Sequence, residues 1–179
     1  MQLTHRSAER KYSEFRKVAM DSVRRRLPYA DKSKISLRNI DGSALSESEK
    51  WECLRDRQVD WPWKTGYYYY SFSYPKRFEL AIWYDNLLCS LSLGRPSYMG
   101  TRLRLEFIES RLAEHPLAGR VTPIVLSVAE VYAGLIGASQ LRIIDPIDKK
   151  LIEYYSAFGY TYKDRAEEKT THYLVKDLL

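Results

Sequence analysis

The hydrophobic and polar positions change their period along the chain, and the first period is helical. Between Ser7 and Leu27 the apolar residues recur every three or four positions among arginines and lysines. These apolar residues are Tyr12, Phe15, Ala19 and Val23. This spacing predicts an amphipathic helix with one narrow apolar stripe. Ser7 can cap its start, and Pro28 disfavours its continuation.

The next stretch has no clear period. Residues 28–45 are polar and mixed, and we expect a loop or linker there. A second, short helix is predicted from Ser46 to Leu54, because Glu49 follows Ser46 by three residues in the pattern of a capping box. The Trp-Pro-Trp sequence at 61–63 then predicts a turn.

Strand-like segments rich in aromatic, β-branched and other apolar residues follow. They are Tyr67–Ser73, Arg77–Tyr84, Leu87–Leu93 and Thr101–Ile108. In the last of these, Leu103, Leu105 and Phe107 alternate with Arg102, Arg104 and Glu106. Alternation with a period of two predicts one apolar and one polar face. Asp85-Asn86 has the length and composition of a hairpin turn, so the sequence predicts four consecutive antiparallel strands.

Helical periodicity returns after residue 120. Val121, Ile124, Val125, Val128, Val131, Tyr132 and Leu135 form one apolar face. We expect Thr122 as the N-cap, Pro123 in the first turn and a stop at Gly137. A strand at Leu141–Ile144 is predicted next. A further helix is expected to open at Asp145-Pro146, run through Tyr155 and end at Gly159, and a hairpin of Tyr160–Lys163 and Thr170–Val175 completes the chain.

This order predicts a mixed α/β (α+β) fold. Its central sheet has antiparallel strands first and then one β-α-β crossover, with flanking helices on the sheet faces. The predicted organisation is a helical N-terminal extension over residues 1–60 and one domain over residues 61–179.

The net charge of +6 is concentrated at the N-terminus. Residues 1–38 contain eleven Lys and Arg against four Asp and Glu, a local charge of +7, so the remaining chain carries −1. A basic arm of this kind suits a polyanion such as RNA, an acidic protein or a membrane surface. The alternative is a solvated helix face without a partner.

Neither a membrane segment nor a metal site is expected. No apolar run approaches the roughly 20 residues of a membrane helix, and the charged N-terminus lacks the apolar centre of a secretory signal, so we expect a cytoplasmic protein. Cys53 and Cys89 lack CxxC spacing and are expected to be reduced, with Cys89 in the core. The scattered histidines, His5, His115 and His172, predict no metal cluster.

One loop has the composition of an anion site. His115 to Arg120 contains Gly119 and precedes the helix predicted from Val121. A helix start presents free N–H groups and the positive end of the helix dipole, which suit a pyrophosphate, and Arg120 adds a cation. A single glycine before a helix is common in other folds too.

The run from Pro116 to Tyr160, and more loosely residues 78–179, resembles the GNAT superfamily of N-acetyltransferases. The family carries a Gln/Arg-x-x-Gly-x-Gly/Ala loop between its fourth strand and third helix, and Gly119 matches the first glycine. Pro116 and Val121 stand where the family has Gln or Arg and the second Gly or Ala. Further on, Pro146, Asp148 and Leu151 precede a Tyr-x-x-x-Gly-aromatic ending at Tyr155-Ser156-Ala157-Phe158-Gly159-Tyr160.

The resemblance implies an acetyl-CoA-dependent N-acetyltransferase. It implies that the backbone of Leu117, Ala118, Gly119, Arg120, Val121 and Thr122 binds the pyrophosphate of acetyl-CoA, with Asp148 at the position of a family asparagine. Tyr155 matches the tyrosine that protonates the CoA sulfur. Glu106 or Glu109, at the end of the fourth strand, is the predicted base that accepts a proton from the amine. His115 is expected to be a loop residue and Cys89 not a nucleophile.

Alternatives remain open at several points. The tyrosine at 155 could be a core residue, and each glutamate a solvated carboxylate. The aromatic residues of 61–70 could line an acceptor site or form an ordinary aromatic core. The competing functions are a GNAT-fold binding or regulatory protein without catalysis, and a nucleic-acid-associated protein such as an acetyltransferase acting on aminoacyl-tRNA. The sequence identifies neither the acceptor amine nor the acyl length, and it leaves a homodimer open.

Overall fold

The computed structural model describes residues 4–112, 114–164 and 171–178. Within these residues the elements are α1 (His5–Arg26), α2 (Tyr29–Lys32), β1 (Ile35–Arg38), α3 (Gly42–Glu52), α4 (Trp63–Ser73), β2 (Phe78–Tyr84), β3 (Leu87–Pro96), β4 (Arg102–Ser110), α5 (Val121–Leu135), β5 (Gln140–Ile144), α6 (Lys149–Ser156), β6 (Thr161–Lys163) and β7 (Tyr173–Asp177). The predicted mixed α/β fold is confirmed. No helix in the described ranges is long and apolar enough to cross a bilayer.

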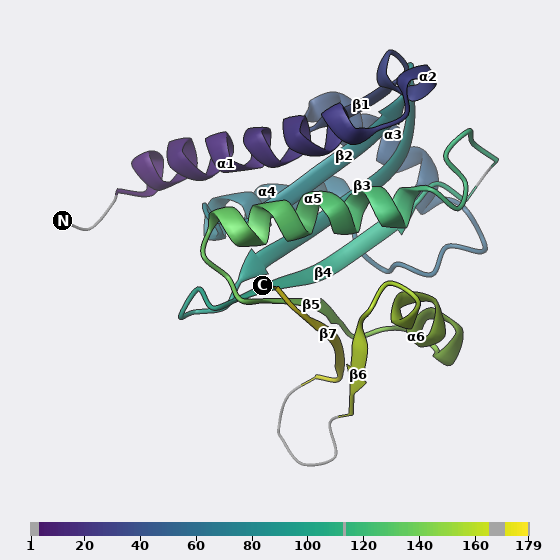
Figure 1. Ribbon diagram of the computed structural model, residues 1–179. Helices are drawn as coiled ribbons and strands as arrows, with labels where there is room; N and C mark the ends of the chain where they lie inside the picture. Colours follow the sequence, from purple (N-terminus) through teal and green to yellow (C-terminus); the bar gives the residue numbers. More distant parts are fainter. Residues whose placement is uncertain (1–3, 113, 165–170, 179) are drawn as a thin grey trace.

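A seven-stranded sheet organises these elements in the order β1-β2-β3-β4-β5-β7-β6 (Figure 1). All neighbouring strands are antiparallel except β4 and β5, which are parallel and joined by the crossover helix α5. A parallel pair needs such a crossover because the chain must return to the same end of the sheet. The predicted β-α-β unit is therefore present.

Helices cover both faces of the sheet. On one face α1 and α5 pack over apolar side chains of β2, β4 and β5, and on the other face α3 and α4 pack over β2 and β3 (Figure 1). The core between the sheet and α1 and α5 includes Leu80, Leu105 and Val125, and the core under α3 and α4 includes Trp63 and Leu91. Residues before 61 thus contribute a strand to the sheet and helices to both layers.

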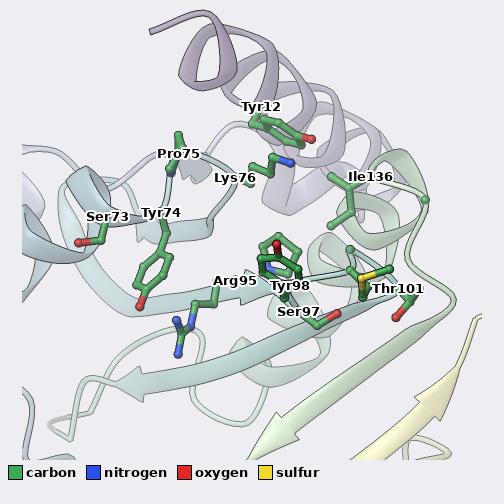
Figure 2. Close-up of a pocket in the computed structure, with 14 residues that line it drawn as sticks. Tyr12, Ser73, Tyr74, Pro75, Lys76, Arg95, Ser97, Tyr98, Thr101 and Ile136 are labelled. Carbon is green, nitrogen blue, oxygen red and sulfur yellow. The ribbon is translucent and has the colours of Figure 1, made fainter. Parts of the chain in front are cut away.

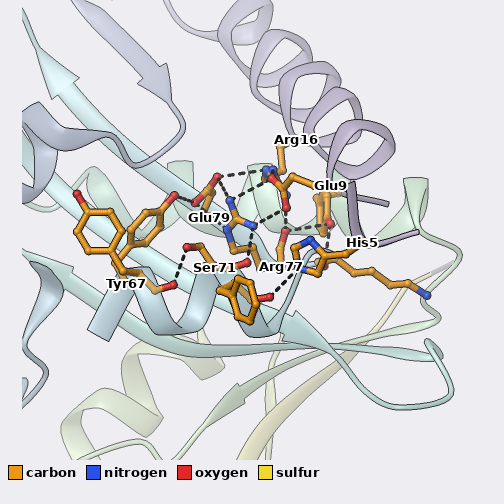
Figure 3. Close-up of polar contacts among 11 residues, drawn as sticks. His5, Glu9, Arg16, Tyr67, Ser71, Arg77 and Glu79 are labelled. Carbon is orange, nitrogen blue, oxygen red and sulfur yellow. Dashed lines mark hydrogen bonds and ion pairs between the residues drawn. The ribbon is translucent and has the colours of Figure 1, made fainter. Parts of the chain in front are cut away.

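A buried ion-pair network joins α1 to β2 and α4 (Figure 3). Arg16 and Glu79 are each 2% exposed and Arg77 is 5% exposed. Glu79 accepts hydrogen bonds from Arg77 Nε at 3.0 Å and from the Tyr67 hydroxyl at 2.6 Å, and it lies 3.4 Å from Arg16 Nε. Glu9 on α1 accepts from both arginines. Buried charges are tolerated only when paired and hydrogen-bonded, so this network fixes where α1 docks.

Four predictions for the N-terminal half were wrong. Thr4 caps α1, where Ser7 was expected. The expected loop over residues 28–45 contains α2, the edge strand β1 and the start of α3, whose cap is Asp41 and not Ser46. The predicted strand Tyr67–Ser73 is helical and belongs to α4. The fourth antiparallel strand is β1 instead.

The C-terminal half follows the prediction more closely. Strands β2, β3, β4, β5 and β6 and helix α5 form where expected. Arg120, not Thr122, occupies the N-cap position of α5, and α6 begins after Asp148 rather than at Asp145-Pro146. Strand β7 begins at Tyr173; Thr170 of the predicted range lies outside the described residues.

A β-bulge interrupts β4 in the middle of the sheet. In the β3–β4 register Leu93 faces Phe107 and Gly94 faces Leu105, so Glu106 is the extra residue. The bulge moves Phe107 to the α4 face, whereas the sequence predicted it on the same face as Leu105. A Cβ on Gly94 would lie 2.4 Å from the carbonyl oxygen of Arg104, so only glycine fits there.

Candidate active site

Strands β4 and β5 diverge, and a cleft opens between them. They pair only from Arg102–Leu105 to Gln140–Ile143, although β4 continues to Ser110. A cleft of about 250 Å³ begins where the pairing ends. Its lining comprises Gln58, Val59, Asp60, Leu105, Glu106, Phe107, Ile108, Ile143, Ile144, Asp145, Pro146, Ile147, Leu151 and Tyr155. Backbone groups on this edge of β4 face the cleft instead of a neighbouring strand.

Tyr155 forms part of the wall of this cleft. It lies on α6 and is only 4% exposed. Its ring contacts those of Tyr154 and Tyr160, at centroid distances of 5.7 and 6.4 Å. Burial, with a smaller contribution from Tyr154, raises the pKa of the Tyr155 hydroxyl above its usual value, so the phenol is protonated across the physiological range. The residue is thus both packed and positioned at the cleft.

Glu106 also lines the cleft, at the bulge in β4. Its carboxylate accepts from Arg95 Nε at 3.0 and 3.1 Å and from the Tyr70 hydroxyl at 2.9 Å. Arg104 Nη2 lies 3.3 Å from Oε1. A carboxylate offers about four lone-pair positions, so these partners hold the Glu106 side chain in a fixed orientation. Burial and the charge of Glu106 raise the pKa of Tyr70, which keeps that hydroxyl a donor.

Glu109, the other predicted base, is held in a buried ion pair with Arg57. It is 5% exposed and is absent from the cleft lining. Arg57 binds it in a bidentate manner, at 2.8 and 3.1 Å, and Trp63 Nε1 donates at 2.5 Å. Arg57 also donates to the carbonyl oxygen of Trp61 at 2.6 Å. Glu109 therefore ties the segment between α3 and α4 to the end of β4, beside the cleft.

The predicted anion loop precedes α5 at the same end of β4. Gly119 has φ +75°, and the amides of Ala118 and Arg120 donate within the loop to His115 and Leu117. Among the described residues, no acceptor is found for the amides of Gly119, Val121 and Thr122. Pro123 has no N–H, so these three are the donors that the helix start offers to a ligand.

The flanking side chains of the loop have definite partners. His115 Nδ1 accepts from the Leu117 amide at 3.3 Å. Burial, and then the charge of Arg111, lower the pKa of His115, which favours the neutral ring that can accept. Arg120 is exposed and pairs with Asp31 on α2. Its hydrogen bond is the main reason why the pKa of Asp31 is lowered.

Two aspartates mark the turn from β5 to α6. Asp148 is the N-cap of α6 and accepts from the Leu151 amide at 2.8 Å, so its carboxylate orients the helix that carries Tyr155. Asp145 lines the cleft and has φ +54°, a left-handed conformation that is uncommon outside glycine. His172 Nε2 lies 2.8 Å from Asp145 Oδ1. Strained residues of this type often occur beside functional sites.

The sequence named Tyr155, Glu106 and Glu109 as candidates, but it pointed neither to Asp60 and Asp145 on the cleft nor to Arg57 as the partner of Glu109. No local pattern could indicate the Arg57–Glu109 pair, because 52 residues separate its members. The aromatic block over residues 61–70 turned out to be divided. Trp63, Tyr67 and Tyr70 are buried against the sheet, whereas Tyr68 and Tyr69 are exposed. The buried members have the helical spacing i, i+4, i+7, a signal that was present in the sequence.

The remaining candidates carry no site chemistry. Cys89 is fully buried in the core, as predicted, and burial raises the pKa of its thiol. Cys53 is exposed and not bonded to Cys89. Within residues 4–112, 114–164 and 171–178, no group of three or more His, Cys, Asp or Glu side chains could hold a metal ion.

Comparison with known proteins gives structural matches alone. No family model and no curated protein sequence matches the chain. The structure matches Ard1 from Thermoplasma volcanium with a TM-score of 0.62 at 9% identity, over 82% of this chain and 99% of that one. A chimera of the Vibrio cholerae spermidine N-acetyltransferase SpeG with hSSAT matches with a TM-score of 0.63 at 10% identity, over 81% and 96%.

A third match extends the pattern. Arabidopsis thaliana Naa50, solved in complex with the bisubstrate analogue CoA-Ac-MVNAL, matches with a TM-score of 0.55 at 14% identity, over 80% of this chain and 98% of that one. Each of these likenesses covers about four-fifths of the chain. This chain therefore has the fold of the GNAT N-acetyltransferases.

Proposed function

We propose that this protein is an acetyl-CoA-dependent N-acetyltransferase that acts on a primary amine. The observation that carries the proposal is the cleft between diverging β4 and β5, which has a buried tyrosine in its wall. The loop and helix start with free amides follow the same end of β4. Relatives in fold support the assignment of the donor: Naa50 was solved with a CoA-containing analogue and yncA of Salmonella typhimurium with acetyl-CoA.

In this proposal the cofactor has two points of attachment. The pyrophosphate lies at the Leu117–Thr122 loop, where Gly119, Val121 and Thr122 can donate backbone hydrogen bonds at the positive end of α5. The thioester arm enters the cleft. Its volume of about 250 Å³ lies below the roughly 300–1,000 Å³ of pockets that enclose a whole drug-sized ligand, so it suits a narrow segment of the molecule. Asp148 contributes by capping the helix that holds Tyr155.

The reaction requires two proton transfers. The neutral amine nitrogen attacks the thioester carbonyl carbon, the C–S bond then breaks, and the thiolate leaves. The Tyr155 hydroxyl gives its proton to that sulfur. With reference pKa values of about 10 for the phenol and 8.5 for a thiol, this transfer is uphill by roughly 2 kcal/mol. Burial of Tyr155 adds to that cost while it guarantees that the proton is present.

The proton from the amine needs an acceptor on the same cleft. Of the two predicted bases, Glu106 lines the cleft and Glu109 does not, so the role is assigned to Glu106, acting through water. Its existing hydrogen bonds restrict it to this indirect route. Asp145 also lines the cleft, and its carboxylate contacts the His172 ring, so it is the second candidate for the base. Glu106→Gln and Asp145→Asn therefore form the pair of variants that identifies the base.

The experiment that tests the proposal compares Tyr155→Phe with Tyr154→Phe. Each variant loses one hydroxyl and little volume, so both should fold. Release of free CoA is measured with a panel of amines, peptides and aminoacyl-tRNA. We expect kcat to fall roughly 10²–10⁴-fold in Tyr155→Phe, with CoA affinity nearly unchanged, and Tyr154→Phe to resemble the wild type.

Other outcomes would refute parts of the proposal. Full turnover in Tyr155→Phe would remove that tyrosine from catalysis. CoA binding without turnover of any acceptor would favour a GNAT-fold binding or regulatory protein. Retention of tRNA at low salt that disappears when the exposed Arg24, Arg25 and Arg26 are changed to Gln would support a nucleic-acid role for the basic arm, because phosphate contacts release counterions.

A further inference from the structure

A second cavity lies away from the cleft, at the opposite end of β4 (Figure 2). It has a volume of about 620 Å³, within the range of small-molecule sites. Its walls come from α1, from the turn between α4 and β2, from the connection between β3 and β4, and from the end of α5. It shares no lining residue with the β4–β5 cleft.

The charges around this cavity have one sign. Lys76 and Arg95 line it, and no Asp or Glu does. Lys76 has no ion pair or hydrogen-bond acceptor for its ammonium in the described part of the chain; its Nζ lies 5.5 Å from the Tyr12 ring centroid. Arg95 pairs with Glu106, but Arg104 pairs with the same carboxylate, so these three groups together carry a charge of +1. The cavity is therefore electropositive.

Two features make Arg95 a ready anion ligand. Glu106 holds its Nε edge, and the guanidinium lies over the Tyr74 ring at 4.2 Å from the centroid. The orientation is thus fixed before any ligand arrives, and the Nη donors have no acceptor among the described residues. Preorganised donors lose less conformational entropy on binding. At the end of α5, the carbonyls of Tyr132, Gly134 and Ala133 accept hydrogen bonds from the amides of residues 136–138.

The remaining lining is aromatic, apolar or hydroxylic. Tyr12, Tyr74 and Tyr98 contribute rings, and Tyr98 and Met99 are almost fully exposed at the rim, at 102% and 77%. An exposed aromatic ring beside a cavity gains from stacking on a planar ligand. Ser97 Oγ is buried without a hydrogen-bond partner in the described structure, which leaves a polar atom unsatisfied at the wall.

We infer that this cavity is a second ligand site, for a planar aromatic or heteroaromatic molecule that carries a carboxylate or phosphate. The anionic group accepts hydrogen bonds from Lys76 and Arg95, and the ring stacks on Tyr98. This site is distinct from the acetyl-transfer cleft, and its existence does not depend on the enzymatic activity proposed above.

The test uses 2-naphthoate as the probe, with the neutral 2-naphthamide and the cationic 2-naphthylmethylammonium as charge controls of similar shape. Binding to the full chain is measured by calorimetric titration. We expect naphthoate to bind at least about tenfold more tightly than either control, because only it complements the two cations. Lys76→Gln and Tyr98→Ser should each weaken naphthoate about fivefold; both side chains are exposed, so neither substitution threatens folding.

Lys50→Gln is the matched control, since it removes an exposed lysine on α3 that pairs with Glu47 far from the cavity. It should bind naphthoate within about twofold of the wild type. The inference is overturned if naphthamide binds as well as naphthoate, if Lys76→Gln binds like Lys50→Gln, or if naphthoate produces no heat of binding at millimolar concentration.

Discussion

The network that docks α1 makes a strong prediction for the variant Glu79→Gln. Glu79 is the charge between Arg16 and Arg77, whose side chains are only 1% and 7% exposed. Without it, two buried guanidinium groups share Glu9, whose side chain is 33% exposed and partly solvated. Removing one partner of a buried ion pair leaves an uncompensated charge and typically costs about 3–5 kcal/mol. We therefore expect Glu79→Gln to lose roughly that much free energy of unfolding.

The assay is urea denaturation followed by far-UV circular dichroism, with the wild type and Glu47→Gln measured alongside. Glu47 pairs with Lys50 on the surface, so its substitution should change stability by less than about 1 kcal/mol. For a chain of this length, a loss of 3–5 kcal/mol also lowers Tm by on the order of 6–20 °C. If Glu79→Gln changed stability no more than Glu47→Gln, the network would not be what fixes α1.

Two further predictions concern the bulge and the acid limb of stability. Gly94→Ala should lower the free energy of unfolding by about 1–3 kcal/mol in the same assay, because the new Cβ would lie 2.4 Å from the Arg104 carbonyl oxygen and must push β4 outward. An unchanged urea midpoint would contradict this. Burial alone would raise the pKa of Glu9, but Arg77 and Arg16 outweigh it and the pKa is lowered. The ionised Glu9 therefore contributes fully to the free energy of unfolding above its unfolded pKa of about 4.3, and this contribution is lost as the pH falls through the lower folded pKa. Glu9→Gln should accordingly make the free energy of unfolding depend less on pH below about 4.3, as measured by urea denaturation at pH 3–6.

The sequence predicted the core of the fold because its periodic signals were unambiguous there. Strands β2 to β5 and helix α5 have long apolar patterns that tertiary packing only confirms. The prediction of a strand was wrong for α4, because it rested on the high strand propensity of aromatic residues. Trp63, Tyr67 and Tyr70 have a helical spacing that was the better guide, since propensity for strands mostly reflects packing.

The site could be predicted only in part, because a sequence shows local order and not which distant residues meet. The motif predicts Tyr155 as a site residue, and the structure places it on the same cleft as Glu106. Glu109 was an equally plausible base from the sequence, but only the fold shows that its carboxylate accepts hydrogen bonds from Arg57 and Trp63. The bulge at Glu106 was also invisible, since it depends on the register of β4 with β3.

The central claim is that the β4–β5 cleft and the loop before α5 bind acetyl-CoA, and calorimetric titration tests it most directly. Gly119 and Gly137 lie just before and after α5, have φ +75° and +78°, and would each place a Cβ in open space. Glutamate at either position therefore strains the backbone similarly, but only Gly119→Glu puts a negative charge at the proposed pyrophosphate site. We predict that the wild type binds acetyl-CoA and that Gly119→Glu binds it at least about tenfold more weakly, a loss of about 1.4 kcal/mol of binding free energy. The affinity of Gly137→Glu for acetyl-CoA should stay within about twofold of that of the wild type. Absence of binding in the wild type, or equal affinity of the two variants, would contradict the account.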